Sequence, residues 1–408
     1  MKRKAAVIGA GIGGMAAAIR LAIKGYETHL FEKNPEPGGK IGELSLGGCR
    51  FDTGPSLFTL PTLVDELFTL AGEDPRDHFR YVSLSSSCRY FYDDGTLLNA
   101  WTDRNRFAAE AESVTGEPRE KVIAFLDECA ELYDLTAGIF IFSPFYQLDN
   151  FRKPESLNVA RNFRKLNTFS TMHGVIKRHF SSGKIIQLFD RYATYNGSSP
   201  YRAPGTLNVI AHLEHNMGAF FPEKGMREIV EAISGLAHRC GVTVHTGEPV
   251  LSVSREGNKI TGVETPNGLI SAEVVVSDVD VIPFYRNLMK EERPARRQEK
   301  QERSTSALIF YWVMNRRFEE LDLHNIFFSS DYPGEFKALA RGEVTGDPTV
   351  YLFASSRVVV SDAPADKDNW FVMINVPFDR GQDWAKLVSK ARGDIINKVS
   401  ARLGINVG

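Results

Sequence analysis

The N-terminal thirty residues alternate apolar runs with glycines, a pattern typical of a strand, a tight turn, a helix and a second strand. Residues 5–8 are all apolar, which predicts a short strand buried on both faces in a parallel sheet. A helix is expected over 13–24, with Gly25 as its C-terminal stop. The second strand is expected over 28–31 and ends at Glu32. The segment predicts a β-α-β unit at the start of an α/β domain.

The rest of the chain leaves this pattern and later returns to it. Between about 60 and 222 the hydrophobic spacing is mainly helical, as at 119–137. From 223 a helix is expected over 226–239, and strands over 242–245, 250–253, 260–264 and 269–277. Beyond these we expect a solvated charged segment over 290–303, strands over 307–313, 350–354 and 370–376, and a helix over 384–403. The chain is therefore predicted to visit a nucleotide domain twice, with a second domain inserted between the visits and continued after them.

Composition excludes several classes of protein. The 408 residues suffice for two or three domains, and 43% hydrophobic with 25% charged residues is typical of a globular chain. A net charge of −2 argues against a nucleic acid as partner. No stretch reaches the ~18 apolar residues that span a bilayer, and we interpret the glycine-broken N-terminal run as fold rather than signal peptide. Four scattered cysteines indicate neither a metal site nor disulfides and favour a reducing compartment: Cys49, Cys88, Cys129 and Cys240.

The glycine-rich turn after the first strand carries the first chemical signal. Gly9, Gly11 and Gly14 have the G-x-G-x-x-G spacing of a dinucleotide-binding turn, in which a pyrophosphate approaches the backbone and the helix N-terminus. Glu32 lies where a carboxylate can accept hydrogen bonds from a ribose diol. The alternative is a tight turn that binds nothing.

A second glycine turn narrows the choice of cofactor. Gly38-Gly39-Lys40 follows shortly after Glu32, and Gly54-Pro55-Ser56 comes next, an arrangement that suits the ribityl and flavin portion of FAD. No second G-x-G-x-x-G occurs, so we expect no separate nicotinamide dinucleotide site. The electrons are then expected to leave to oxygen, a quinone or another diffusing acceptor.

Several motifs carry a resemblance to a known family. They are EKN at 32–34, PGGK at 37–40, FDTGP at 51–55, YNGS at 195–198, PYRAPGTL at 200–207, FPEKGM at 221–226, AEVVV at 272–276 and HNI at 324–326. The chain resembles the bacterial phytoene desaturases, a family of carotenoid desaturases, over essentially its whole length. The resemblance implies a Rossmann-like FAD-binding domain of the flavoprotein monooxygenase and amine oxidase type, with an inserted mixed α+β substrate domain. It places the FAD-binding domain at 1–75 and 223–285, and the substrate domain at 76–222 and 286–408.

The resemblance also implies roles for individual residues. Those expected to line the cofactor are Gly9, Gly11, Gly14, Glu32, Lys33, Gly39, Lys40, Gly54, Pro55, Ser56 and, through its backbone beside the adenine, Val250. Relatives continue beyond the equivalent of residue 408 with a glycine-rich segment that closes over the flavin. From this we expect that the final segment of the FAD-binding domain is missing, although residues 405–407 look like the start of a strand.

The implied reaction is the introduction of C=C bonds into a C40 polyene, by hydride transfer to flavin N5 and loss of a proton from the neighbouring carbon. A carotenoid isomerase, a polyene saturase, a flavin amine oxidase and a non-catalytic isoprenoid-binding protein stay as alternatives. No catalytic dyad or metal cluster is evident. Tyr201 and Arg202 are candidates for the wall of a substrate tunnel or for a structural turn. His212, in His-Leu-Glu-His at 212–215, is a candidate for packing or for a place beside the flavin.

An apolar segment followed by a basic one predicts contact with a membrane surface. Residues 135–146 hold Leu135, Ile139, Phe140, Ile141, Phe142, Phe145 and Tyr146. Residues 152–191 hold nine Lys or Arg against Glu155 and Asp190, a net of +7 from nine minus two. An apolar element beside basic residues favours monotopic attachment to anionic lipid, on the cytoplasmic face of the cell membrane. A core helix with a solvated basic neighbour is the alternative.

Overall fold

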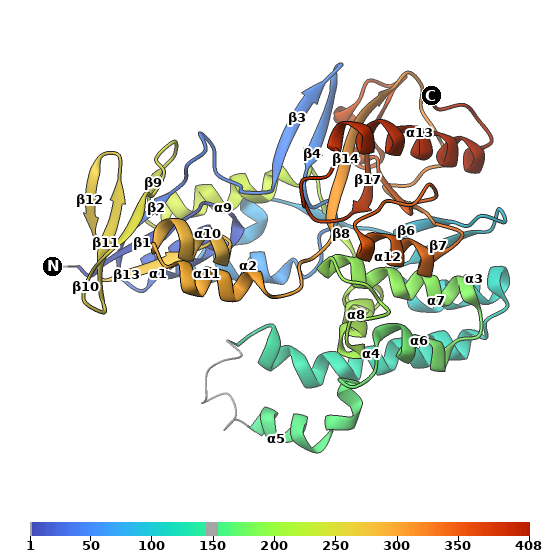
Figure 1. The fold of residues 1–408 in the computed structure, drawn as a ribbon, viewed down its shortest axis with the longest axis horizontal. Coiled ribbons are helices and arrows are strands. Elements are labelled where there is room, and N and C mark those ends of the chain that lie inside the picture. Colours follow the sequence, from blue (N-terminus) through green and yellow to red (C-terminus); the bar gives the residue numbers. More distant parts are fainter. Residues whose placement is uncertain (1, 144–153) are drawn as a thin grey trace. The chain divides into compact units, whose positions relative to one another are not determined.

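The computed structural model describes residues 2–143 and 154–408 and divides the chain into two compact units (Figure 1). The first unit consists of residues up to 82 together with 220–303. The second consists of 83–219 and 304–408. The chain thus enters each unit twice.

The first unit is built on a four-stranded parallel sheet in the order β13-β1-β2-β9. Its strands are β1 (Lys4–Ile8), β2 (Glu27–Phe31), β9 (Thr243–His245) and β13 (Val274–Ser277). Three helices pack against one another beside it: α1 (Ile12–Ile23), α2 (Thr62–Leu70) and α9 (Arg227–Arg239). The predicted β-α-β unit is confirmed, and residues 5–8 are buried as expected for a strand covered on both faces.

A smaller antiparallel sheet shares a hydrophobic core with the parallel sheet. It consists of β10 (Ser252–Glu256), β11 (Lys259–Thr265) and β12 (Gly268–Ser271). Ala6, Ile8 and Phe31 of the parallel sheet cluster with Val253 and Val263 of the small one. The single strand predicted over 269–277 is wrong. β12 ends at Ser271 and β13 (Val274–Ser277) begins three residues later, and the two strands belong to different sheets.

The junctions between the units differ from the predicted ones. Residues 76–82 belong to the first unit because the short helix η1 (Pro75–Asp77) packs on α2 and the Tyr81 hydroxyl donates to Asp65 Oδ2 at 2.7 Å. Residues 286–303 belong there because η6 (Phe284–Leu288) and α11 (Glu292–Glu299) pack on α10 (Val281–Pro283). The unit also contains the hairpin of β3 (Gly42–Leu46) with β4 (Cys49–Thr53), and the pair of β5 (Tyr81–Ser83) with β8 (Phe220–Pro222).

The second unit is a six-stranded sheet in the order β14-β17-β16-β15-β6-β7. The strands are β14 (Ser306–Met314), β17 (Asp368–Val376), β16 (Val350–Phe353), β15 (His324–Phe327), β6 (Ser86–Phe91) and β7 (Leu97–Trp101). All neighbours are antiparallel except β15 and β6. It is mixed α+β, as expected for the inserted domain.

Helices cover both faces of this sheet (Figure 1). On one side α13 (Trp384–Leu403) packs Ile395 and Val399 against Trp370. On the other, Tyr90 of β6 joins an aromatic core with Phe125 and other helical residues. The helices are α3 (Arg104–Thr115), α4 (Arg119–Phe140), α5 (Pro154–Arg161), α6 (Met172–His179), α7 (Gly183–Asp190), α8 (Val209–His215) and α12 (Tyr332–Arg341). The strand suggested over 405–407 does not form, because the chain turns at Gly404 and folds back on Ser400.

Candidate functional site

The first and third glycines of the G-x-G-x-x-G turn hold strand β1 and helix α1 together. Gly9 has φ +95°, and its N–H donates to the carbonyl of Phe31 at 2.8 Å. A Cβ atom on Gly14 would overlap the carbonyl oxygen of Gly9. The helix therefore crosses the turn so closely that only glycine fits at position 14.

The second glycine lies at the N-terminus of α1, beside the carboxylate of Asp278. A Cβ on Gly11 would meet only the carboxylate of Asp278, at 2.5 Å from Oδ2, among the described residues. Gly11 is also the N-cap of α1; no side chain caps this end and no acidic residue occupies its first turn. The first N–H groups of α1 are thus available to an anionic ligand.

Glu32 connects the end of β2 to the glycine turn. Its carboxylate is buried, 5% exposed, and accepts hydrogen bonds from the N–H groups of Ala10 and Asn34, both at 2.9 Å. Each carboxylate oxygen keeps a further acceptor position, which a ribose hydroxyl can use.

The second glycine turn packs directly on the first. Gly38 N–H donates to the carbonyl of Ala10 at 2.8 Å. A Cβ on Gly39 would lie 3.1 Å from the Cα of Gly11, and one on Gly54 would overlap the carbonyl oxygen of Lys40. Three of the predicted glycine segments therefore meet in one place. Of the neighbouring candidates, Lys33, Lys40 and Pro55 are exposed and Ser56 is buried.

A hydrogen-bonded contact joins two of the sequence motifs, FDTGP at 51–55 and FPEKGM at 221–226, next to the glycine turns. Asp52 is buried, and its carboxylate accepts hydrogen bonds from the N–H of Met226 at 3.0 Å and from Arg50 Nη2 at 2.8 Å. Met226 precedes α9, so the side chain of Asp52 caps that helix. The two motifs, FDTGP at 51–55 and FPEKGM at 221–226, are thus joined to each other by hydrogen bonds in the folded protein.

Val250 lies just before β10 rather than within it. Its side chain packs on the core shared by the two sheets of the first unit. The segment that leads to it runs beside the end of β2, where the N–H of Glu248 donates to the carbonyl of Glu32 at 2.9 Å. The expected adenine contact is thus predicted for a loop instead of a strand.

Tyr201 and Arg202, the candidates for the tunnel wall, are consecutive in the second unit, and His212 lies in α8 of the same unit. The ring of Tyr201 lies 4.8 Å from the ring of His173. Burial raises the pKa of the Tyr201 hydroxyl above its usual value. Arg202 is exposed, in a turn where its N–H donates to Ser199. His212 stacks on Tyr133 at 4.8 Å, and burial lowers its pKa.

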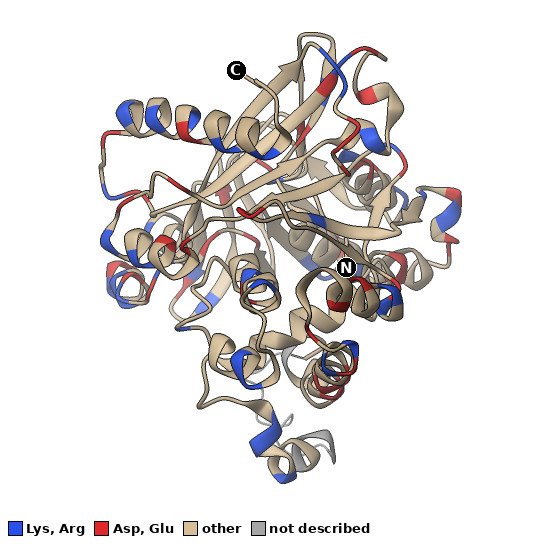
Figure 2. Cartoon of the chain, turned by 90° about the vertical axis from the view of Figure 1, so that its right-hand side faces the viewer, with Lys and Arg blue, Asp and Glu red and all other residues tan. Residues whose placement is uncertain are grey.

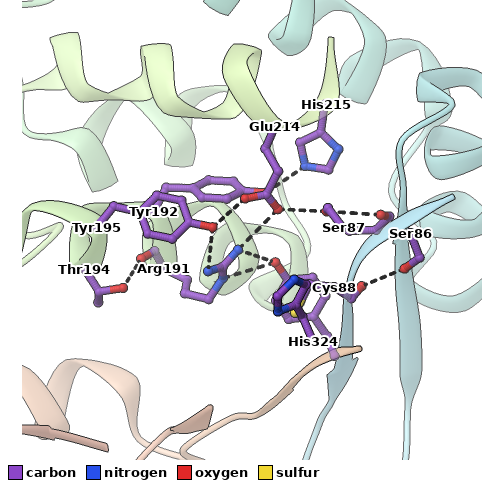
Figure 3. Close-up of polar contacts among 12 residues, drawn as sticks. Ser86, Ser87, Cys88, Arg191, Tyr192, Thr194, Tyr195, Glu214, His215 and His324 are labelled. Carbon is purple, nitrogen blue, oxygen red and sulfur yellow. Dashed lines mark hydrogen bonds and ion pairs between the residues drawn. The ribbon is translucent and has the colours of Figure 1, made fainter. Parts of the chain in front are cut away.

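The sequence analysis missed a buried polar network centred on Glu214, which Figure 3 shows. Glu214 Oε1 accepts hydrogen bonds from Ser87 at 2.8 Å and Tyr192 at 3.0 Å, and Oε2 accepts from Tyr195 at 2.6 Å. Arg191 Nη2 lies 3.5 Å from Oε1 and donates to the hydroxyl of Tyr90 at 2.7 Å. These residues come from three elements of the second unit, β6, the short helix at Arg191–Asn196 and α8, so no local sequence motif indicates the network.

Charges in this network are set by burial and by the Arg191–Glu214 pair. Burial raises the pKa of Glu214, but Arg191 and the hydrogen bonds outweigh it and hold the pKa below the usual value. Burial lowers the pKa of His215 to about 4, and that of His324 to about 3. The pair is therefore ionised and both histidines are neutral at pH 7. In the described part of the chain, no group of three or more His, Cys, Asp or Glu residues is arranged to hold a metal ion.

The predicted membrane segment divides into buried and exposed parts. Leu135 and Ile139 are buried, so this part is core rather than surface, and Arg191 is buried rather than part of a basic face. Large apolar side chains are exposed at two places in this stretch of sequence: Ile141 at 40% and Phe142 at 55%, and Phe163 at 45% and Phe169 at 92%, whose rings lie 5.8 Å apart.

Arg161 and Arg164 are exposed in this stretch of sequence, and Lys165 pairs with Glu131. Figure 2 draws all Lys and Arg residues in blue. The side chain of Phe140 and those of Phe145, Tyr146, Arg152, Lys153 and Glu155 lie outside the described residues. Among the helices that the structure describes, none combines the length and apolarity needed to cross a bilayer.

Comparison with known proteins identifies the family. The family of flavin-containing amine oxidoreductases matches residues 12–352. A 1-hydroxycarotenoid 3,4-desaturase from Flavobacterium sp. (strain P99-3) is 41% identical over 406 residues, which cover 99% of this chain and 83% of that protein. The chain belongs to the carotenoid desaturases of this flavoprotein family. It is an FAD-dependent oxidoreductase, which confirms the resemblance, the fold class and the cofactor predicted from the sequence.

Two further relatives extend the comparison of this desaturase-family chain. A zeta-carotene-forming phytoene desaturase from Myxococcus xanthus is 29% identical over 405 residues, covering 98% of this chain and 78% of that protein. The crystal structure of an oxidoreductase from Methanosarcina mazei matches with a TM-score of 0.64 at 14% identity, covering 98% of this chain and 84% of that one. The structural match shows the shared fold alone.

Proposed function

We propose that the protein is a carotenoid desaturase that introduces carbon–carbon double bonds into a C40 polyene in carotenoid biosynthesis. The observation that carries the proposal is the 41% identity to a 1-hydroxycarotenoid 3,4-desaturase across 99% of this chain. That match covers the second unit as well as the first unit, which holds the glycine turns. The flavin-binding fold by itself is compatible with many reactions.

The residues of the first unit fit FAD. The N-terminus of α1 at Gly11, which no side chain caps, would receive the pyrophosphate, and Glu32 the ribose. Gly39 and Gly54 would bring the backbone against the flavin side, with Val250 toward the adenine. When bound, FAD supplies a hydride acceptor for a saturated carbon of the substrate.

The chain's own contribution to the chemistry is then binding and orientation. An allylic position in a polyene delocalises the charge that develops there, so loss of the proton does not require a strongly basic side chain. Tyr201 and Arg202 stay our candidates for the substrate path. Because the sequence holds a single G-x-G-x-x-G, oxygen or a quinone is the proposed electron acceptor.

We also propose peripheral attachment to the cytoplasmic face of the cell membrane, where a C40 hydrocarbon is dissolved. Support comes from the exposed large apolar side chains of Ile141, Phe142, Phe163 and Phe169, and from the exposed Arg161 and Arg164 that flank Phe163 in sequence. Apolar insertion together with basic residues is the arrangement that binds anionic lipid without crossing it.

The test is a reaction with the purified FAD-loaded protein and carotenoid in liposomes, with oxygen or a quinone as acceptor. A desaturase yields a product that has lost two hydrogen atoms, in proportion to the acceptor consumed. An isomerase leaves the mass unchanged and a saturase adds two hydrogens. Oxidation of amines but not of polyenes would contradict the proposal in favour of an amine oxidase.

A further inference from the structure

The second glycine turn, residues 37–41, contains two residues in the backbone region that favours glycine. Gly38 has φ +130° and Gly39 has φ +60°. Inside the turn, the N–H of Ile41 donates to the carbonyl of Gly38 at 3.0 Å. Glycine loses more conformational freedom on ordering than any other residue, so a turn with two consecutive glycines is costly to hold in one conformation. Contacts from outside the turn therefore matter for its order before a ligand binds.

Arg227, the first residue of α9, makes such contacts with its side chain. Nη1 donates to the carbonyl of Pro37 at 2.8 Å and to that of Ile41 at 3.3 Å, and so joins the two ends of the turn. A Cβ atom on Gly38 would lie 2.7 Å from Nη1, so the guanidinium packs against the turn itself. Nη2 pairs with Glu36 at 3.0 Å, but Glu36 is 75% exposed and such a pair contributes little stability. The backbone contacts are therefore the significant ones.

Arg227 is in turn fixed to the body of the first unit. Asp52 caps the N-terminus of α9, and its Oδ1 accepts from the N–H of Arg227 at 3.4 Å. Helix α9 packs on α1, which begins at the first glycine turn. A Cβ on Gly39 would lie 3.1 Å from the Cα of Gly11, so the conformation of the second turn sets the space above the first. The Arg227 side chain thus connects the second turn to the helices that carry the first.

We propose that Arg227 is a positioning residue for FAD, which holds residues 37–41 in the conformation that receives the ribityl and flavin side of the cofactor. A guanidinium presents several N–H donors in one plane, whereas a lysine ammonium is a point charge on a flexible stem. A turn that is ordered before binding removes the entropy cost of ordering it around FAD. The inference rests on the proposed assignment of this turn to the flavin side of FAD, and it does not depend on the substrate.

The experiment measures binding of FAD and of ADP to the apoprotein by isothermal titration calorimetry. ADP contains the adenine, ribose and pyrophosphate of FAD but lacks the ribityl and flavin groups, so it does not need the second turn. The variants are Arg227→Met, which removes the donors and the charge, and Arg227→Lys, which keeps the charge. Arg239→Met is the matched control, since Arg239 lies on the same helix but pairs with Glu73. The melting temperature of each apoprotein establishes that it is folded.

Arg227→Met is expected to raise the Kd for FAD at least about tenfold and to leave the Kd for ADP within about twofold of the wild type. Arg227→Lys should lose most of the same affinity for FAD, because one ammonium does not replace the planar donors. Arg239→Met should bind both ligands as the wild type does.

Two results in the variants would overturn the inference. An equal loss of FAD and ADP affinity in Arg227→Met would show a merely structural role, and full FAD affinity in Arg227→Lys would show that only the charge acts. A wild type that binds FAD no more tightly than ADP would refute the assignment of the turn to the flavin side, and the inference with it. The expected FAD dependence on Arg227 in a protein without desaturase turnover would support the inference and refute the proposed reaction alone.

Discussion

Asp52 and Met226 lie 174 positions apart in sequence, and the carboxylate of one caps the helix that the other precedes. The contact joins the hairpin strand β4 to α9, which packs on the helix of the glycine turn. Two motifs that are far apart in the chain therefore act on the same part of the nucleotide unit.

Asp52→Asn is expected to destabilise this unit by about 2 kcal/mol, because the amide group cannot accept from both the helix N-terminus and Arg50. Urea denaturation measures the free energy of unfolding. Asp103→Asn is the control, since Asp103 caps α3 in the other unit through Arg106 N–H, and we expect a change within about 0.5 kcal/mol. Equal losses in the two variants would mean that the link between motifs adds nothing.

Gly11→Val is expected to abolish FAD binding while the fold persists. The new side chain meets only the Asp278 carboxylate, which can rotate, but it fills the space that the pyrophosphate needs. Gly14→Ala, by contrast, forces a Cβ against the backbone of Gly9 and should lower the melting temperature itself. Flavin absorbance per protein and thermal unfolding separate the two. Full flavin occupancy in Gly11→Val would refute the assignment of this turn to the pyrophosphate.

The carboxylate of Asp278 lies beside the space expected to receive an anion. A Cβ on Gly13 would lie 2.7 Å from its Oδ1, as one on Gly11 would from Oδ2 at 2.5 Å. Like charges repel by about 1 kcal/mol at such a partly solvated site, so Asp278→Asn should bind FAD several-fold more tightly, most visibly at low salt. Asp280→Asn is the control, because Asp280 caps α10 instead. Fluorescence titration of the apoprotein gives the Kd, and a weaker Kd in Asp278→Asn would contradict the prediction.

Glu335 should make the stability of the second unit depend on pH. Its buried carboxyl accepts from the N–H and hydroxyl of Thr349, and burial raises its pKa from 4.5 to about 7. The folded state therefore keeps the proton to higher pH than the unfolded state. Its contribution to the free energy of unfolding falls as pH rises from about 4.5 to about 7, by up to ~3 kcal/mol.

Glu335→Gln removes this titration. The stability of the variant relative to the wild type should rise across the same window and stay constant below and above it. Urea denaturation at a series of pH values measures the difference, with exposed Glu343→Gln as the control. A difference that does not change with pH would show that Glu335 is ionised in the folded protein at pH 5.

Phe169→Glu is expected to weaken binding to anionic liposomes, because its ring is 92% exposed beside the basic residues and a carboxylate there opposes both apolar insertion and charge attraction. Val360→Glu is the matched control, since Val360 is 71% exposed elsewhere in the same unit. Arg161→Glu with Arg164→Glu, which reverse two charges, should cost at least about 1 kcal/mol of binding free energy per residue reversed near the surface. Co-sedimentation reports both effects, and equal losses for Phe169→Glu and Val360→Glu would remove this patch as the anchor.

The sequence predicted the fold and the cofactor most reliably in the segment where one local motif specifies both. The glycine spacing with its apolar strand predicted β1, α1 and β2 and their cofactor. Prediction failed at 269–277, because this stretch contains no Gly or Pro to indicate that Ser271 ends one sheet and Val274 begins another. Glu214 was missed for a different reason: its partners come from distant segments such as Ser87 and Arg191, so the network exists only in the folded unit.

The central sheet of the nucleotide unit has a consequence for biosynthesis. Strand β2 ends at Phe31, but its neighbour β9 begins at Thr243 and β13, the neighbour of β1, at Val274. At ribosomal rates of about 5–20 residues per second, some 10–40 s pass between synthesis of β2 and of β9. During this interval β1 and β2 have free edges that can pair with other chains. The nascent chain should therefore depend on chaperones until β9 and β13, in the second segment of the first unit, have been made, and slower aggregation at low expression temperature should raise the soluble yield.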